Sequence, residues 1–419
     1  MRVFAAILLF SSAFSLAQTS HDKLAEKALA YYENFDYRMA AETYSQLDTS
    51  KISVLRPLSL SWWKIGDLGN AQRGFAKIVE MEGHTHDDIF SYVRLLRQVE
   101  YYGEAEKQMD RYTEMQPKSD ITLDYAKNKG RSDRLKMADT TYFVMPMNMN
   151  SKHQEFGVSY YKSSVVFVSS RENTEPIRRR YNVSQLPFLD LYTANIYDSN
   201  FVAIAPFPDG INSKFHEGPA AFTAAGDLMI FSRNDLKPNA SGHYYSHLYS
   251  SRNDGSGWTT PQQLAFDTTA CSSVHPSISA DGKWLYFSST MAGGDGGSDI
   301  WKVEIMADGG FGSPMNLGTS VNTEGNESWP FIHPENNLFF FSSDSRYGLG
   351  GMDVFVAQVQ KEKISGARNL GAPVNSSSDD FSFVLSADKK SGFISSDRKG
   401  GRGSDDIYFV DMRSGFPEK

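Results

Sequence analysis

A phrase repeated through the second half of the chain is the feature that most constrains the fold. Each copy has an apolar run ending in serine, then a glycine-rich loop, then an aspartate followed by a second apolar run. The anchor serines of three copies are Ser288, Ser342 and Ser395, which lie about fifty residues apart. A period of this length, built from short strands, predicts a radial or stacked array of small sheets.

Four strand-like phrases make up each complete copy. After Asp139 the pattern has period two and is rich in Tyr, Phe, Val and Ile, with Gly, Asn, Asp and Pro between the runs. Four short strands per copy, repeated in a ring, are typical of a propeller blade. Two weaker copies come first, at 165–192 and 217–249. The sequence therefore predicts a five-bladed β-propeller over residues 137–419.

The last copy ends without a fourth strand, because the chain stops soon after Val410. The segment Val144–Ser151 resembles the fourth phrase of an earlier copy, Ser313–Asn322, and stands directly before the first copy. We expect this segment to join the sheet that contains Ile407–Val410 and to close the ring. Closure removes an open sheet edge, which would otherwise invite aggregation.

Residues 18–136 have a helical period instead. A small residue is followed four positions later by a large one in three copies spaced by 31 and 34 residues: Ala40 and Tyr44, Ala71 and Phe75, Ala105 and Met109. This spacing resembles that of tetratricopeptide repeats, whose stacked hairpins present a concave face to a peptide or partner helix. The candidate partner-binding residues on that face are Tyr32, Trp62, Trp63 and Tyr92. A helical bundle that only packs on the next domain is the alternative.

The N-terminus predicts export. A basic head at Arg2, an apolar run over 3–10 and small residues before Gln18 are typical of a secretory signal peptide over residues 1–17. The run is too short to span a membrane, and no later run is long enough. Cys271 is the only cysteine, which excludes an internal disulfide. The net charge of −8 argues against nucleic acid as a partner.

The glycine-rich loops before Asp299, Asp353 and Asp405 resemble calcium-binding repeats. Calcium needs six to eight oxygen ligands in one place, whereas these loops belong to different blades. We therefore predict that the three aspartates are structural turn residues that accept hydrogen bonds from the loop backbone. No metal site is expected, and a calcium-stabilised adhesin is a less favoured alternative.

The sequence shows no catalytic constellation. His216-Glu217 lacks the second histidine of a zinc-protease helix, and no G-x-S-x-G elbow is present. Residues 251–258 approximate the aspartate box of sialidase propellers, which is a turn motif. We expect a protein that is not an enzyme and has no cofactor. A pair of carboxylates assembled across the central channel, as glycosidases need, stays open at this level.

Tyr286–Ser289 and the phrase Ser395–Tyr408 resemble the WD-like or TolB-like blades of Bacteroidetes envelope proteins. With a signal peptide and helical repeats in front, the layout is similar to a periplasmic component of the type IX secretion and gliding machinery. That component carries an OmpA-like domain after the propeller, whereas this sequence ends at Lys419, right after the fifth copy. The chain is either a short relative or a fragment, so peptidoglycan binding is not carried over from the resemblance. The resemblance implies a periplasmic scaffold that binds envelope proteins, near the outer membrane. A propeller that binds or hydrolyses glycans is the alternative.

Overall fold

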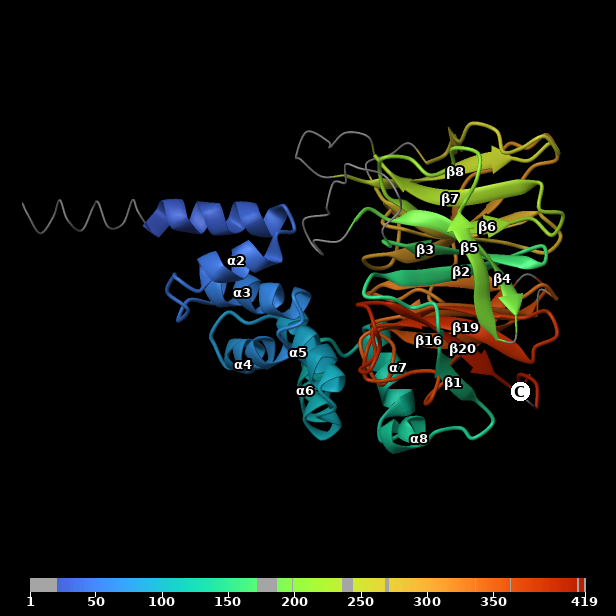
Figure 1. Cartoon of the computed structure of the whole chain (residues 1–419). Helices are drawn as coiled ribbons and strands as arrows, with labels where there is room; N and C mark the ends of the chain where they lie inside the picture. The colour runs from blue at the N-terminus through green and yellow to red at the C-terminus, as the bar shows by residue number, and fades with distance from the viewer. Residues whose placement is uncertain are drawn as a thin grey trace, which may run out of the picture. The chain divides into compact units, whose positions relative to one another are not determined.

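The computed structural model describes residues 21–171, 187–197, 199–235, 244–267, 271–335, 337–361, 363–412 and 414–417. These residues form two compact units that divide after Gln116. The first unit is helical and the second contains the sheets (Figure 1). The predicted signal peptide at 1–17 lies outside the described residues.

The helical unit is a series of antiparallel hairpins. A helix over residues 21–33 is followed by α2 (Tyr37–Tyr44), α3 (Ile52–Lys64), α4 (Leu68–Ile78), α5 (His86–Gln98) and α6 (Tyr102–Met115). The small and large residues that the sequence pattern pairs are all buried: Ala40, Tyr44, Ala71, Phe75, Ala105 and Met109. The pattern therefore identifies the apolar faces along which these helices pack.

The turns inside the hairpins share one backbone geometry. Phe35, Gly66 and Glu100 have φ of 59°, 78° and 65°, in the left-handed region that ends helices. The next helix then begins at a capping side chain in two of the three hairpins. Asp36 and Asp67 each accept a hydrogen bond from the backbone N–H three residues later.

Two further helices belong to the second unit, α7 (Asp120–Asn128) and α8 (Ser132–Lys136). The carboxylate of Asp124 accepts a hydrogen bond of 2.7 Å from the Tyr347 N–H, and the Ala372 N–H donates to the Leu135 carbonyl at 2.8 Å. These contacts fix both helices to loops of the propeller. The division between units thus falls twenty residues before the expected boundary at 136, because helical periodicity does not show what a helix packs against.

The propeller has five antiparallel four-stranded sheets, which we number as blades 1 to 5 in chain order. Blade 1 contains β2 (Glu155–Tyr161), β3 (Ser164–Ser169), β4 (Asp190–Tyr197) and β5 (Asn200–Pro206); blade 2 contains β6 (Glu217–Phe222), β7 (Leu228–Asn234), β8 (Ser246–Arg252) and β9 (Gln262–Gln263); blade 3 contains β10 (Ser273–Ile278), β11 (Trp284–Ser289), β12 (Asp299–Glu304) and β13 (Met315–Asn316). Blade 4 contains β14 (Glu327–Ile332), β15 (Leu338–Ser343), β16 (Asp353–Gln360) and β17 (Lys363–Asn369). Blade 5 contains β18 (Asp380–Leu385), β19 (Ser391–Ser396), β20 (Asp406–Asp411) and a strand from much earlier in the chain.

That strand is β1 (Phe143–Pro146), which pairs antiparallel with β20. Val144 lies opposite Val410, and the Met147 N–H then donates to the Ile407 carbonyl at 3.0 Å. Figure 1 shows β1 beside β20 at the seam of the ring. The predicted five-bladed propeller, closed by an N-terminal strand, is confirmed.

Apolar clusters fill the space between successive blades. Val168 of blade 1 belongs to the same cluster as Phe231 of blade 2, and Phe167 belongs to the same cluster as Phe393 of blade 5. Each of these side chains is at most 1% exposed. Since burying a large apolar side chain stabilises a fold by about 1.5–3 kcal/mol, blade-to-blade packing holds the ring together and keeps the first strands around a central channel.

Candidate functional site

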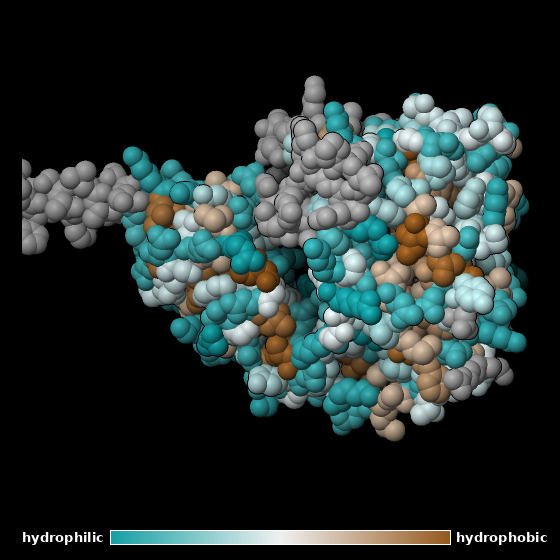
Figure 2. Space-filling model, viewed as in Figure 1, coloured by the Kyte–Doolittle hydropathy of each residue, from teal (hydrophilic) through white to brown (hydrophobic). Residues whose placement is uncertain are grey.

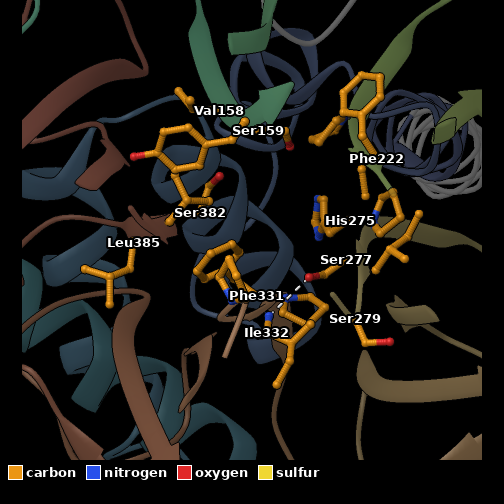
Figure 3. Close-up of a pocket in the computed structure, with 18 of the residues that line it drawn as sticks. Val158, Ser159, Phe222, His275, Ser277, Ser279, Phe331, Ile332, Ser382 and Leu385 are labelled. Atoms are coloured by element: carbon orange, nitrogen blue, oxygen red, sulfur yellow. Dashed lines mark hydrogen bonds between the residues drawn. The ribbon is translucent and has the colours of Figure 1, made fainter. Parts of the chain in front are cut away.

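The central channel of the propeller contains a cavity of about 430 Å³. Its lining comes from the first strand of every blade, namely β2, β6, β10, β14 and β18. Figure 3 shows the side chains of Ser159, Phe222, Ser277, Phe331 and Leu385 around this space. The size is within the range of pockets that bind small molecules or single side chains of a partner.

Trp329 crosses the channel and forms the floor of the cavity. It extends from blade 4, yet its ring lies 5.9 Å from that of Phe156 in blade 1, 3.6 Å from His275 in blade 3 and 5.0 Å from Phe381 in blade 5. Gly157 leaves room for it, because a Cβ there would lie 3.5 Å from the indole and 2.9 Å from Pro219. Aromatic pairs of this kind contribute about 0.5–1.5 kcal/mol each beyond burial. Aromatic rings from four blades therefore fill part of the channel at this level.

A repeated bulge turns these side chains into the channel. His275, Trp329 and Ser382 have φ of 54°, 56° and 53°, and Gly157 takes the same left-handed region at 70°. The strand register shifts at each of these four positions, as a bulge requires. A side chain in this region carries strain on the order of 1 kcal/mol. Three blades thus keep a strained side chain where glycine would be unstrained.

The polar groups of the cavity are neutral apart from one lysine. Burial lowers the pKa of His275 to about 3, so the imidazole is uncharged. Its Nδ1 atom is buried and has no hydrogen-bond partner in the part of the chain that the structure describes. The Ile332 N–H donates to the Ser277 hydroxyl at 3.2 Å, drawn as a dashed line in Figure 3. Lys162 is exposed and marks the rim.

No aspartate or glutamate is among the described residues that line this cavity. The sequence left open a pair of carboxylates across the channel. The described lining of this cavity contains no such pair. The sequence did contain a signal for the floor, since His275-Pro276 and Trp329-Pro330 stand at the same place in their repeats. From the sequence alone, His275 is most simply interpreted as a turn or core residue, because a sequence does not show that five strands converge.

Buried carboxylates mark the junctions between blades at the other end of the first strands. Glu155, Glu217, Glu327 and Asp380 begin β2, β6, β14 and β18, and all four are fully buried. Each accepts hydrogen bonds from the N–H and hydroxyl of the serine or threonine four residues earlier: Ser151, Ser213, Thr323 and Ser376. The preceding loop is thereby tied to the blade that follows it.

Arginines neutralise these carboxylates. Arg171, Arg233 and Arg398 lie 3.4, 2.9 and 2.5 Å from the carboxylates of Glu155, Glu217 and Asp380. In blade 4, Arg346 donates to the Val321 carbonyl at 2.9 Å, and its charge acts on Glu327. Burial raises the pKa of Glu217 to about 7, opposed by the hydrogen bonds from Ser213 and by Arg233.

Asparagines complete four of the five junctions. In each case the side-chain amide bonds both the N–H and the carbonyl of one residue in the third strand of the preceding blade. The pairs are Asn150 with Ile407, Asn212 with Leu191, Asn322 with Ile300 and Asn375 with Val354. This arrangement explains why the fourth phrase of the repeat ends in asparagine.

The predicted turn aspartates occupy two kinds of position. Asp299 accepts hydrogen bonds from the N–H groups of its own loop, Asp295 and Gly296, and Asp353 does the same with Leu349 and Gly350. In the third loop the equivalent residue is Asp406, whose carboxylate accepts from the Arg402 and Gly403 N–H groups.

Asp405 therefore needs a correction. Its carboxylate accepts a hydrogen bond of 2.8 Å from the Gln154 side chain, and its backbone carbonyl accepts from the Glu155 N–H. The tandem Asp405-Asp406 made the register of this loop ambiguous in the sequence. Among the described residues, no group of three or more His, Cys, Asp or Glu side chains could hold a metal ion.

The aromatic candidates of the helical unit are mostly packed. Tyr92 is 7% exposed and lies in the core, while Tyr32, Trp62 and Trp63 are half-buried. Trp63 donates to the Gln98 side chain at 2.5 Å. Helical periodicity selected these aromatics as candidates, but it did not show how far neighbouring helices bury each of them.

Other apolar side chains of the helical unit reach the surface instead. Leu29, Phe35, Tyr101 and Met115 are between 44% and 57% exposed. In the view of Figure 2, apolar side chains come to the surface over this unit among hydrophilic ones. Phe35 and Tyr101 lie at the turns inside two hairpins. Within the described residues, no helix is long and apolar enough to cross a membrane.

Comparisons with known proteins give similarities of fold at low identity. No family model and no curated protein matches the chain. The structure of a putative TolB from Agrobacterium tumefaciens is 16% identical, with a TM-score of 0.35, over 65% of this chain and 78% of that one. A GH43 endo-arabinanase from Bacillus licheniformis is 12% identical, with a TM-score of 0.41, over 64% of this chain and 96% of that one. This chain is thus similar to TolB-like and glycoside hydrolase structures, at values that carry no argument about activity or partner.

Proposed function

We propose that this protein is a non-enzymatic scaffold of the bacterial cell envelope, which holds protein partners through its helical unit and its propeller. The observation that carries the proposal is the cavity in the channel. Its walls are largely apolar, its floor is the Trp329 and His275 pair, and no carboxylate is among its described lining residues. Such a cavity suits the binding of an apolar side chain from a partner.

The glycan alternative receives no support from the cavity. Glycoside hydrolysis needs two carboxylates flanking the bond, about 5–10 Å apart, and the described lining supplies neither. Sugar binding commonly uses an open aromatic face, but the Trp329 ring is flanked by His275 and Phe381. We therefore place binding of a protein segment ahead of binding of a glycan.

The helical unit supplies the second proposed surface. Exposed apolar side chains at Leu29, Phe35, Tyr101 and Met115 give it groups that a partner can bury. Placement in the periplasm, next to the outer membrane, is supported by the export-type N-terminus and by the resemblance to envelope propellers. Membership of a type IX secretion or gliding assembly rests on that resemblance alone.

A deletion experiment tests the scaffold. A variant that lacks residues 21–116 keeps α7, α8 and β1, so its propeller should still unfold cooperatively. After cross-linking in the envelope of the source cell, this variant should lose the partners that the full chain retains. The matched point variant is F35S with Y101S, which removes exposed apolar groups without touching the core. Retention of the same partners by the deletion variant would contradict the proposal.

A second experiment concerns the cavity. Replacing Ser277 by Trp fills the space between the floor and the rim, and should abolish cross-links that map to the propeller. Ser250→Ala, on a third strand outside the cavity lining, is the control. Turnover of any glycan by the wild-type protein, lost in the Ser277→Trp variant, would overturn the non-enzymatic assignment.

A further inference from the structure

We propose that the junction between blades 2 and 3 is a pH-sensitive latch, closed while His247 is protonated between Asp235 and Asp267 and loosened when it loses that proton. The latch concerns the ring itself, so it does not depend on which partner the propeller binds.

The geometry is a buried histidine between two carboxylates. His247 Nδ1 lies 3.3 Å from Asp267, and Nε2 lies 3.3 Å from Asp235. His247 is 5% exposed and Asp267 is fully buried. Asp267 also accepts hydrogen bonds from the Leu248 N–H at 2.6 Å and from the Ser273 hydroxyl at 2.9 Å. One carboxylate thereby joins β8 of blade 2 to β10 of blade 3.

This junction departs from the other four at three positions, although it keeps the serine of the second strand. Ser273 stands where the other blades begin with glutamate or aspartate, and Asp267 takes over the bond to the third strand that asparagine makes elsewhere. Met291 stands where blades 1 and 5 have arginine. Its N–H donates to the Ser289 hydroxyl, as the Arg171 N–H donates to Ser169. The buried carboxylate therefore has a histidine, not an arginine, as its cationic partner.

That exchange makes the charge of the junction titratable. Arginine keeps its charge at every physiological pH, whereas histidine changes charge between about pH 5 and 8. If His247 is neutral, Asp267 is a buried carboxylate without a cation beside it, which is unfavourable. The four arginine junctions cannot lose their cation in this way.

The groups facing His247 come from both neighbouring elements. Asp235 follows β7, and Asp267 precedes β10. Arg233 lies directly opposite on β7, but its guanidinium is paired with Glu217. Two carboxylates therefore act on the imidazole against one cation. Because burial raises the pKa of Glu217 to about 7, the charge of Arg233 is fully neutralised only above that pH.

The direction of the pH effect follows from these contacts. The hydrogen bond to Asp267, followed by the charges of Asp267 and Asp235, raises the pKa of His247 above its ordinary value of 6.5, although burial opposes the rise. Because the pKa of His247 is higher in the folded state than in the unfolded state, its protonated form stabilises the fold. This contribution is fully present below pH 6.5, the ordinary pKa, and is lost as the pH rises through the raised pKa. The latch is closed in acid and loosens in neutral to basic solution.

Hydrogen exchange of the full chain tests this directly. After correction for the intrinsic pH dependence of exchange, amides of β8 and β10 should open more often as the pH rises from about 5.5 to about 8.5, by about tenfold for each unit of pKa difference. In the His247→Gln variant, the amides of β8 and β10 should exchange fast at every pH. Met291→Arg, which places a permanent cation beside Asp267, should exchange slowly at every pH.

The controls separate this effect from general loss of stability. His84→Gln removes a histidine of the helical unit whose Nδ1 contacts the Met81 carbonyl, and it should keep the wild-type profile. Amides of β14 and β18 report the rest of the ring, including the pH dependence expected from Glu327 and Asp397, whose pKa values are raised to about 7. That part of the profile should be the same in the wild type and in the Met291→Arg variant. Equal pH profiles in the wild type and the Met291→Arg variant would overturn the proposal, even if the His247→Gln variant fails to fold.

Discussion

Blades 4 and 5 have the same hydrogen bonds between asparagine and backbone, but they differ in which parts of the chain form their four strands. Blade 4 is built from contiguous residues, 327–369, whereas blade 5 combines 380–411 with β1. The asparagine contacts are nearly identical. Asn375 bonds the Val354 backbone at 2.8 and 2.9 Å, and Asn150 bonds the Ile407 backbone at 3.1 and 2.8 Å. The partners are 21 residues apart in one case and 257 in the other.

The difference lies in the entropy of the chain rather than in the contacts. Closing a loop costs free energy that grows with the logarithm of its length, so the longer closure costs about 2 kcal/mol more. The seam between β1 and β20 is therefore the junction that we expect to open first. Three predictions test or sharpen this comparison.

The largest effect should come from removing β1. A chain that begins at Ser151 loses the buried Met147, the Asn150 contacts and the cover of the β20 edge. We expect its unfolding free energy to fall by about 5 kcal/mol or more relative to a chain that begins at Pro117, measured by urea denaturation.

Addition of a peptide with the sequence of residues 139–151 should restore part of that stability. Equal denaturation midpoints for the chains that begin at Pro117 and at Ser151 would show that β1 does not close the ring.

An intermediate effect should follow from removing the asparagine at either junction. Asn150→Ala and Asn375→Ala each leave one buried N–H without its partner, which costs about 1–3 kcal/mol, while the Ile407 and Val354 carbonyls still accept from the Met147 and Leu370 N–H groups. Global stability should therefore fall by similar amounts. Hydrogen exchange should differ, with Asn150→Ala exposing β20 by local opening and Asn375→Ala opening only with the whole ring. Identical exchange patterns would mean that the seam is no weaker than the other junctions.

The smallest effect on stability should come from the residue that precedes the first strand of a blade, which is Asn326 in blade 4 and Asp379 in blade 5. In blade 4, Asn326 donates to the Asp344 carboxylate at 2.9 Å; in blade 5, Asp379 and Asp397 bring two carboxylates together. Desolvation and the charge of Asp379 raise the pKa of Asp397 to about 7. Because the folded state then holds a proton that the unfolded state has lost, stability falls as the pH rises from 3.8 to about 7.

Asp379→Asn should flatten that pH dependence. Asp397 is exposed as a whole residue although its carboxyl group is desolvated. Solvent screening should therefore keep the gain near pH 8 below about 1 kcal/mol. Urea denaturation at about pH 5 and about pH 8 measures it. The reverse change in blade 4, Asn326→Asp, should introduce a pH dependence there. If the pH dependence of stability is the same in the Asp379→Asn variant as in the wild type, the two carboxylates are not its cause.

Much of the fold could be predicted because the repeat is strict in spacing. Ser288, Ser342 and Ser395 are each the last residue but one of the second strand of their blade. The likeness of Val144–Ser151 to Ser313–Asn322 identified the closing strand. The boundary between the units was harder to predict. The helix at Asp120 has the same periodicity as the helices before it, and only its contact with Tyr347 assigns it to the propeller.

The candidate site was predictable only in part. The repeated His275-Pro276 and Trp329-Pro330 placed two side chains at equivalent positions, but nothing in the sequence indicated a left-handed backbone there. The floor of the cavity also needs the small Gly157 on a strand far away in the chain. The packing of Trp329 depends on the space that a residue of another blade leaves free, and local sequence periodicity does not show that space.

The sequence by itself determined the number of blades, the strand that closes them and the absence of a disulfide, because these follow from spacing and from residue counts. The tertiary structure alone decided that the Trp329 ring meets aromatic rings of three other blades and that His247 takes the place of an arginine. Both depend on side chains from different blades meeting in space, and a linear pattern records neither their distance nor their burial.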